Sequence, residues 1–296
     1  MESRNQLRGI VYMLLSGFTF VLNDSLMKLA IADLPPYQVL VMRGIAGVIF
    51  AMALIKFNGD TLRLNMISRP VLLRAGLEAV AILTYIIALA HAPIGDVTAI
   101  FQTTPLLVIL GMIFIHREKT ELLRVGLVVL GFIGALLVAQ PGQGTISPFV
   151  MLAFITAIFA AMRDLAARQI PNDVPAMFST LVLILTVLIC AFICGMIFEH
   201  WLVPSAALIA MTLGAGFMMM LGHHFTLLAY RSASAQAVAP FYYSFMVFAV
   251  IAGYLIFGDV PNALGFIGMT VIVLSGIAIL MIEKSERADV FQSVDL

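Results

Sequence analysis

The chain has 296 residues, of which 62% are hydrophobic and 11% are charged, and its mean hydropathy is +1.09. Soluble domains have about a quarter of their residues charged, so this composition excludes an ordinary water-soluble globular protein. The formal net charge is zero and no long run of one charge occurs, which argues against a nucleic-acid partner. We therefore predict a multi-pass integral protein of a bacterial cytoplasmic (inner) membrane, surrounded by the lipid bilayer.

Ten apolar runs are long enough to cross a bilayer, which takes about 20 mostly apolar helical residues. The first run is too long for the apolar core of a signal peptide and contains Asp24, so we expect it to be retained. Short loops connect the runs, which predicts an all-α polytopic membrane protein with ten transmembrane helices. The runs cover residues 9–31, 36–55, 71–90, 95–115, 121–139, 148–169, 175–198, 206–229, 234–257 and 262–282.

Positively charged residues predict the orientation, because Lys and Arg concentrate in cytoplasmic loops. Of the 16 Lys and Arg residues, all except Lys28 and Arg43 flank the chain ends or the loops that follow even-numbered spans. Both termini are therefore expected to be cytoplasmic. Lys28 and Arg43 lie toward the outer ends of the first two spans, where an isolated cation costs a few kcal/mol unless it is paired or reaches the surface.

An internal repeat divides the chain into residues 1–140 and 141–283, each a five-helix half, followed by a short cytoplasmic tail at 284–296. Because five is odd, the halves must insert with opposite orientations, an architecture found in many secondary transporters. The alternative is that duplication only built a stable bundle. A shift of 140 residues aligns Asp24 with Asp164, Lys28 with Arg168, Pro35 with Pro175 and Phe101 with Phe241, and two single-residue gaps align Glu118 with Asp259 and Gly134 with Gly276.

Several motifs accompany this repeat: "MRGIAG" with Arg43, "FQTTPLL" with Pro105, Glu118 closing the fourth span, and "FGDV" with Asp259. They make the chain similar to the EamA branch of the drug/metabolite transporter superfamily over residues 9–282. The resemblance implies a ten-helix carrier that works by alternating access around a central cavity. One departure is that Pro240 lies five residues before the position that matches Pro105, so the hinge of the second half is left undefined.

Charged residues within the spans are candidates for gates. At about 1.5 Å per helical residue, Asp24 and Arg43 lie at a similar depth below the outer surface. We predict that they pair, directly or through Lys28; the alternative is that the pair only locks the first two helices together. Asp164 and Arg168 occupy the mirror position near the cytoplasmic end of the sixth span, where an interfacial anchor is the competing interpretation.

Two further positions carry titratable groups inside spans. Glu78 is in the middle of the third span, where a carboxylate needs a partner or a proton, so we predict a proton-coupling group or a substrate contact. A helix-to-helix hydrogen bond is the alternative. His223 and His224 point about 100° apart on the eighth span, so we expect only one of them to face the cavity. His223 is taken as the candidate. No spacing suggests a metal site.

The fourth helix of each half begins with polar and aromatic residues at the same depth. Aromatic rings can stack on a planar group, and amides and hydroxyls can orient it, so we predict that these residues line a substrate pocket; helix packing is the alternative. Pro105 is a candidate hinge, or a tolerated kink. The predicted lining residues are Phe101, Gln102, Thr103 and Thr104 in the first half and Phe241, Tyr242, Tyr243 and Ser244 in the second.

These features predict a transporter for a small polar metabolite that needs no cofactor. A pocket of aromatics, amides and hydroxyls favours a neutral or zwitterionic solute; riboflavin uptake is the specific expectation, and export of amino acids or other metabolites is the alternative. An intramembrane enzyme would have to use His91 and Asp96, although Asp96 is better explained as a helix cap. Small residues at Ala153, Ala157 and Ala161 allow close packing within the chain or in a homo-oligomer, so the oligomeric state is left open.

Overall fold

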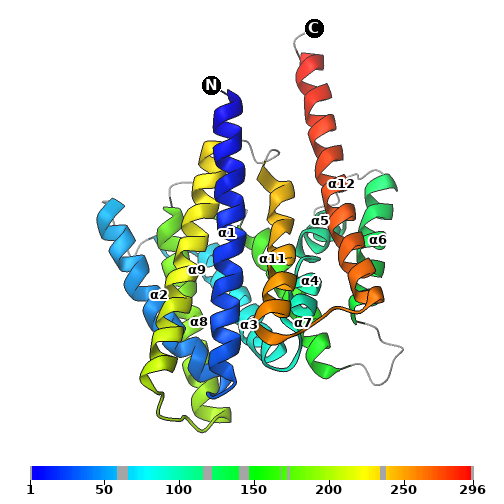
Figure 1. Cartoon of the computed structure of the whole chain (residues 1–296). Helices are drawn as coiled ribbons and strands as arrows, with labels where there is room; N and C mark the ends of the chain where they lie inside the picture. The colour runs from blue at the N-terminus through cyan, green and yellow to red at the C-terminus, as the bar shows by residue number, and fades with distance from the viewer. Residues whose placement is uncertain are drawn as a thin grey trace.

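The computed structural model describes residues 2–58, 66–115, 122–139, 147–167, 169–171, 174–233 and 238–294. The elements in these ranges are all helices. They are α1 (Glu2–Ile31), α2 (Pro36–Asn58), α3 (Arg69–His91), α4 (Ile94–Phe101), α5 (Thr104–Ile115), α6 (Leu122–Ala139), α7 (Pro148–Ala167), α8 (Ala176–Phe198), α9 (Ala206–Ser232), the 3₁₀ helix η2 (Ala239–Tyr243), α11 (Ser244–Ala252), the π-helix η3 (Gly253–Phe257) and α12 (Ala263–Val294). The start of α1 and the end of α12 lie at the same end of the bundle (Figure 1).

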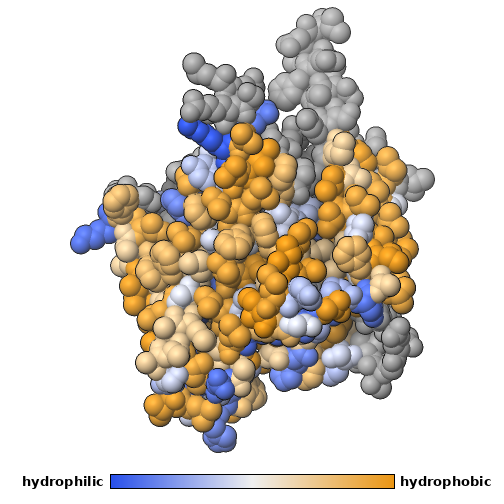
Figure 2. All heavy atoms as spheres, in the orientation of Figure 1, coloured by the Kyte–Doolittle hydropathy of each residue, from blue (hydrophilic) through white to orange (hydrophobic). Residues whose placement is uncertain are grey.

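Seven helical segments of the described ranges are long and apolar enough to span a membrane, and each coincides with a predicted run. Shorter apolar helices at Val125–Val138, Phe241–Phe257 and Ala263–Ile279 fall within the other three runs. Apolar side chains dominate the described surface in Figure 2, whereas Asn23, Asp24 and other polar residues are buried. A lipid-facing exterior with a polar interior explains this distribution, because lipid offers no hydrogen bonds.

The fourth predicted span is broken rather than continuous. α4 ends at Phe101 and α5 begins at Thr104, after a short turn. Pro105 explains the break, because it has no N–H for the Phe101 carbonyl and its ring collides with that carbonyl in a regular helix. Two hydroxyls use the carbonyls at the break: Thr104 Oγ1 donates to Phe101 and Thr103 Oγ1 donates to Ile100, both at 2.6 Å.

The ninth predicted span is interrupted at the matching place. Its first part is the 3₁₀ helix η2, which has Pro240 in its first turn and ends at Tyr243, and α11 begins at Ser244. A change of helix type therefore supplies the second break, without a proline at the position that matches Pro105. In both halves the interruption falls within the polar and aromatic stretch of the fourth helix.

Equivalent positions of the two repeats are in direct contact at these breaks. Gln102 Nε2 donates to the carbonyl of Tyr242 at 3.2 Å, and the two residues are 140 positions apart. The helix packing follows the same equivalence: α1 packs on α9 as α3 packs on α7, α2 on α9 as α8 on α3, and α1 on α11 as α7 on α5. Exchanging the halves therefore reproduces the packing, and the two breaks lie near the axis of that exchange.

The loop between α8 and α9 is tied to the start of α2, at the end of the bundle opposite the chain termini (Figure 1). The Glu199 carboxylate accepts hydrogen bonds from the backbone N–H groups of Tyr37 at 2.9 Å and Gln38 at 3.1 Å. The first N–H groups of a helix have no partner within the helix, so a carboxylate there is a favourable cap. Burial nevertheless raises the pKa of Glu199.

α6 and α12 approach most closely at two glycines. A Cβ atom on Gly268 would lie 2.5 Å from the carbonyl oxygen of Gly134 and 2.9 Å from the backbone nitrogen of Val138. Backbone atoms cannot rotate away as a side chain can. Glycine at this position therefore sets the distance between the two helices.

We expect Gly268→Ala to destabilise the protein by about 1–3 kcal/mol, because the added methyl group forces α6 and α12 apart. Gly126→Ala is the matched control, since nothing lies within 4 Å of a Cβ at Gly126 and alanine is the better helix former. Thermal unfolding of the detergent-purified variants measures both effects. Equal melting temperatures for the two variants would contradict the proposed close contact.

Candidate functional site

One face of α3 holds the first helix of each half. Tyr85 Oη donates to Asp24 Oδ2 on α1 at 2.6 Å, and Glu78 Oε2 contacts Arg163 Nη1 on α7 at 2.5 Å. Residues seven apart lie two helical turns apart on the same side, so both partners face the interior from one stripe of α3. These two contacts define the centre of the candidate site.

Asp24 is surrounded by uncharged donors. Besides the Tyr85 hydroxyl, the adjacent Asn23 amide donates to its Oδ1 at 2.8 Å, and only 6% of the Asp24 surface is exposed. Arg43, on α2, is 7% exposed and donates from Nη1 to the sulfur of Met27 at 3.3 Å. The charges of Asp24 and Arg43 are near enough to interact electrostatically.

The expected ion pair between Asp24 and Arg43 is not formed. The ion pairs described for the ordered part of the chain, with nitrogen and oxygen within 4.0 Å, do not include this pair. Tyr85 and Asn23 donate to one oxygen each of the carboxylate, and Arg43 donates to Met27 instead. Lys28 does not bridge them either, because it is engaged elsewhere.

Glu78 has the partner that its depth requires. Arg163 bonds it and also contacts Asp164 at 2.9 Å, so one guanidinium lies between two carboxylates. The Asp164 side chain is 44% exposed, whereas that of Glu78 is 10% exposed. Arg163 therefore points into the bundle and contacts Asp164, for which a gate and an interfacial anchor are the two interpretations; Arg168 lies outside the described residues.

The two histidines of α9 have different surroundings. The His223 ring packs edge-on against Phe20 of α1 with ring centroids 5.1 Å apart, and it interacts electrostatically with Glu78 and Arg43. The His224 ring instead lies 6.4 Å from that of its neighbour Phe225. His223 thus faces the charged centre, in the direction expected of the cavity-facing histidine.

The first half of the predicted pocket lining reaches Asp24 through Tyr85. The Phe101 ring packs edge-on against Tyr85 at 5.8 Å, and Gln102 is fully buried with no partner for its Oε1. Thr103 is also buried, but its hydroxyl is used by the helix break. A role in binding substrate stays a prediction for each of these residues.

The second half of that lining is divided. Tyr242 meets Gln102 through its backbone carbonyl. Tyr243 is buried against α12, where its hydroxyl occupies the space beside Gly276, and Phe241 is 36% exposed. The structure therefore brings the Tyr242 backbone to the contact between the two breaks, packs Tyr243 against α12 and leaves Phe241 exposed.

A second charged cluster lies at the end of the bundle opposite the chain termini. Lys28 Nζ donates to the carbonyl of Ala92 at 2.6 Å, lies 3.8 Å from Asp259 Oδ2 and sits 5.0 Å above the Phe257 ring. Gly258 adopts a left-handed conformation (φ 72°) at the end of η3, which turns the chain toward this contact. Lys28 thus joins α1 to both the α3–α4 and the η3–α12 connections.

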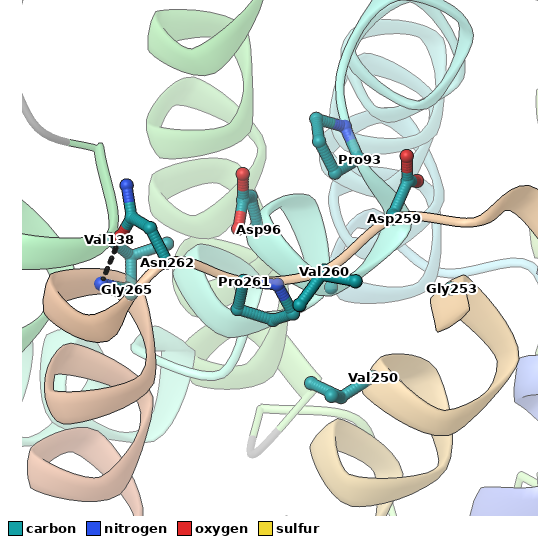
Figure 3. Close-up of a pocket in the computed structure, with 11 residues that line it drawn as sticks. Pro93, Asp96, Val138, Val250, Gly253, Asp259, Val260, Pro261, Asn262 and Gly265 are labelled. Carbon is teal, nitrogen blue, oxygen red and sulfur yellow. Dashed lines mark hydrogen bonds between the residues drawn. The ribbon is translucent and has the colours of Figure 1, made fainter.

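A pocket of about 190 Å³ adjoins this cluster. Figure 3 shows Asp96 projecting from α4 and Asp259 from the segment between η3 and α12, with Val250 of α11 on another side. Pro93 is the N-cap of α4 and makes no side-chain cap bond. The expectation that Asp96 caps this helix is therefore wrong. Asp96 lies in the first turn, where a negative charge interacts favourably with the helix dipole.

His91 and Asp96 have separate surroundings. The His91 ring bonds the Ile87 carbonyl at 2.9 Å and stacks on Phe149 at 3.9 Å, whereas Asp96 lines the pocket. Among the residues that the structure describes, no group of three or more His, Cys, Asp or Glu is suited to a metal ion.

Three residues of these clusters were missing from the sequence-based site. Arg163 gave no clear signal, because it lies near a span end, where long basic side chains commonly reach the membrane surface. Tyr85 gave no signal, since a single hydroxyl in an apolar helix is common. Asp259 was noted only as the repeat of Glu118, and its "FGDV" motif with a turn-forming glycine was the signal that could have placed it.

A model of the EamA-like transporter family matches the chain twice, at residues 7–140 and 147–282. The riboflavin transporter of Vibrio cholerae is 30% identical over 276 residues, covering 91% of both chains. The pseudopaline exporter CntI of Pseudomonas aeruginosa is 26% identical and covers 93% of this chain and 97% of its own. The S-adenosylmethionine uptake transporter of Rickettsia prowazekii is 25% identical over 98% of both chains.

The fold is also found among solved structures. A crystal structure of a protein 20% identical in sequence superposes with a TM-score of 0.64 and covers 91% of this chain and 98% of the other. At that identity the likeness shows the shared fold. The two family matches together span almost all of the apolar helices, and the chain is therefore a multi-pass integral membrane protein that belongs to the EamA-like transporter family.

Proposed function

We propose that the chain is a secondary transporter that moves a small polar metabolite across the cytoplasmic membrane by alternating access. The proposal includes ten spans arranged as two inverted five-helix repeats, with both termini in the cytoplasm. The observation that carries it is the contact between Gln102 and Tyr242, which joins equivalent breaks of the two repeats near their axis. Transporters of this architecture bind substrate where such discontinuous helices meet.

Two features support the orientation. The start of α1 and the end of α12 lie at one end of the bundle (Figure 1), and Lys and Arg residues concentrate in the loops expected at that end. The cluster of Lys28 and Asp259 then faces the outside. Because it joins α1, from the first half, to the connection before α12, from the second half, we propose that it is the outer latch.

Arg163 is the proposed switch on the cytoplasmic half of the site. It contacts both Glu78, which is almost buried, and the more exposed Asp164. Protonation of Glu78 removes one of its two ionic contacts and leaves Arg163 with Asp164, which loosens α3 from α7. Glu78 is thereby the proposed proton-coupling group, and Asp164 is the group that retains the cation.

The family relatives support two substrate types. The riboflavin transporter of Vibrio cholerae supports uptake of that vitamin, as we expect from the pocket lining. The pseudopaline exporter and the S-adenosylmethionine uptake transporter support a charged metabolite, carried outward in one case and inward in the other. We take riboflavin as the first solute to test and a charged metabolite as the alternative.

Counterflow in proteoliposomes tests the carrier mechanism. Vesicles loaded with unlabelled riboflavin, and matched vesicles loaded with S-adenosylmethionine, should transiently accumulate the labelled form of whichever solute is carried. The initial rate should saturate with concentration, because each cycle must bind a solute at one site. A flux that rises linearly without saturation would instead indicate a channel.

Removing the latch should open the outer side. We expect Lys28→Gln to raise the labelling rate of a cysteine placed at Val250, in the pocket, by about two- to fivefold, since a partly exposed ion pair contributes up to about 1 kcal/mol. A membrane-impermeant maleimide measures the rate after Cys190 and Cys194 are replaced by alanine. Lys56→Gln, at an exposed position at the end of α2, is the control, and equal rates in both variants would reject the latch.

A double-mutant cycle tests the pair on α3 and α7. Glu78→Gln should lower the unfolding free energy, because it leaves Arg163 buried with one partner, and Glu78→Gln combined with Arg163→Gln should recover about 1–3 kcal/mol. Thermal unfolding reports the coupling.

Uptake measured against pH reports the proposed role of Glu78: a pH dependence that survives Glu78→Gln would exclude it as the coupling group.

A further inference from the structure

Two buried charges at the centre of the molecule have no ionic partner. Among the residues that the structure describes, Asp24 is bonded only by the uncharged donors Tyr85 and Asn23. Arg43 donates to the thioether of Met27, which is a weak acceptor, and its Nε has no partner in the described part of the chain. Both residues are more than nine-tenths buried, so water does not replace the missing partners at the surface.

The neighbouring pair shows what a structural ion pair looks like in this protein. Arg163 contacts Glu78 and Asp164 together, so each of these three groups has an ionic partner in direct contact. Leaving a charge unpaired in the interior costs several kcal/mol, so retention of two such groups side by side needs another explanation. A bound solute that supplies the missing partners is that explanation.

The charge balance of the site restricts that solute. The electrostatically interacting groups are three carboxylates (Asp24, Glu78 and Asp164) and three guanidinium groups (Arg43, Arg74 and Arg163), and their charges sum to zero. A neutral solute leaves Asp24 and Arg43 without an opposite charge in direct contact, and a singly charged solute adds a buried charge that nothing compensates. Only a solute with one positive and one negative group pairs both residues and keeps the site neutral.

We infer, on the basis of the proposed transport function, that the substrate is dipolar, with a cationic group that contacts Asp24 and a carboxylate that contacts Arg43. Arg43 then serves as a carboxylate receptor, with a planar guanidinium suited to two parallel hydrogen bonds. Asp24 serves as the cation receptor and is held in place by Tyr85 and Asn23.

The remaining groups around Asp24 fit a cation better than an anion. The aromatic pair of Tyr85 and Phe101 lies beside it, and aromatic faces attract cationic groups. Asn23 Oδ1 is a buried acceptor next to Asp24 that has no donor in the described residues. An ammonium group carries the donors that such acceptors lack.

The inference chooses between the two substrate types above. Riboflavin is neutral at pH 7, whereas S-adenosylmethionine carries an ammonium, a sulfonium and a carboxylate, which is one positive charge more than the site balances. Amino acids carry the first and last of these groups on one carbon. The solutes that bind should therefore come from the charged, amino-acid-like class.

A thermal-shift screen of the purified full chain tests this, because a ligand of the folded state raises its melting temperature. The panel contains dipolar solutes (the amino acids), neutral solutes (riboflavin and nucleosides), dicarboxylates, and S-adenosylmethionine, which adds a second cation to the dipolar pair. We expect stabilisation by dipolar members only. For each one that binds, the analogue with a carboxamide in place of the carboxylate, and the analogue without the amino group, should bind about tenfold or more weakly.

Variants assign the two groups to the two residues. In Arg43→Gln the acid and its carboxamide should bind with equal affinity, and Arg43→Lys should restore part of the preference for the acid. In Asp24→Asn the preference for the amino group should disappear instead. Met27→Leu is the matched control, since it removes the contact of Arg43 without changing a charge, and both preferences should persist.

The comparison of analogues on the unmodified chain does not depend on how the variants fold. Stabilisation by neutral or singly charged solutes alone, or by no dipolar solute, overturns the inference, as does a carboxylate preference that survives in folded Arg43→Gln. Saturable counterflow of riboflavin with no dipolar binding would overturn the inference and leave the proposed transport function standing. Absence of counterflow with every solute that binds would overturn the transport function itself.

Discussion

The scarcity of hydrogen-bond partners in lipid is the constraint on which the rest of this structure depends. A charged side chain in a membrane helix must find its partner on a neighbouring helix, so each buried charge fixes one helix contact. Tyr85 and Glu78 lie on one face of α3 and meet the first helix of the first half and the first helix of the second. α3 thereby joins the two repeats through their polar groups.

The same constraint explains how the interrupted helices are tolerated. Pro105 deprives a carbonyl of its donor, and the hydroxyls of Thr103 and Thr104 bond the carbonyls at the break. In the second half a 3₁₀ segment performs the interruption without an equivalent proline. Both breaks expose backbone polar groups to a site within the bundle, which a continuous helix cannot do. The contact between Gln102 and Tyr242 then joins the two breaks, near the axis that relates the halves.

The apolar runs and the repeat could be read from the sequence, because hydropathy and helix length are local properties. The pairing of charges could not, because it depends on helix rotation and on third residues. Asp24 and Arg43 were expected to bond on the basis of equal depth, yet Tyr85, 61 residues from Asp24, occupies the carboxylate. Lys28 likewise forms its ion pair with Asp259, which belongs to the other half. Several possible partners lie at one depth in the membrane, and only the packed structure shows which of them a charged residue contacts.

The two halves have the same fold but different side chains. This difference distinguishes the proposed gates at the ends of the bundle from the candidate site at its centre. The charge of Lys28 recurs as Arg168 and that of Asp259 as Glu118. Arg168 and Glu118 lie outside the described ranges. Most central residues do not recur: the shift of 140 residues puts Leu183 opposite Arg43, Met218 opposite Glu78 and Phe225 opposite Tyr85, whereas Asp24 recurs as Asp164. The proposed alternating access needs two entrances and a single binding site. Duplicated charges at the ends and a largely unduplicated polar centre meet both requirements within one repeated fold.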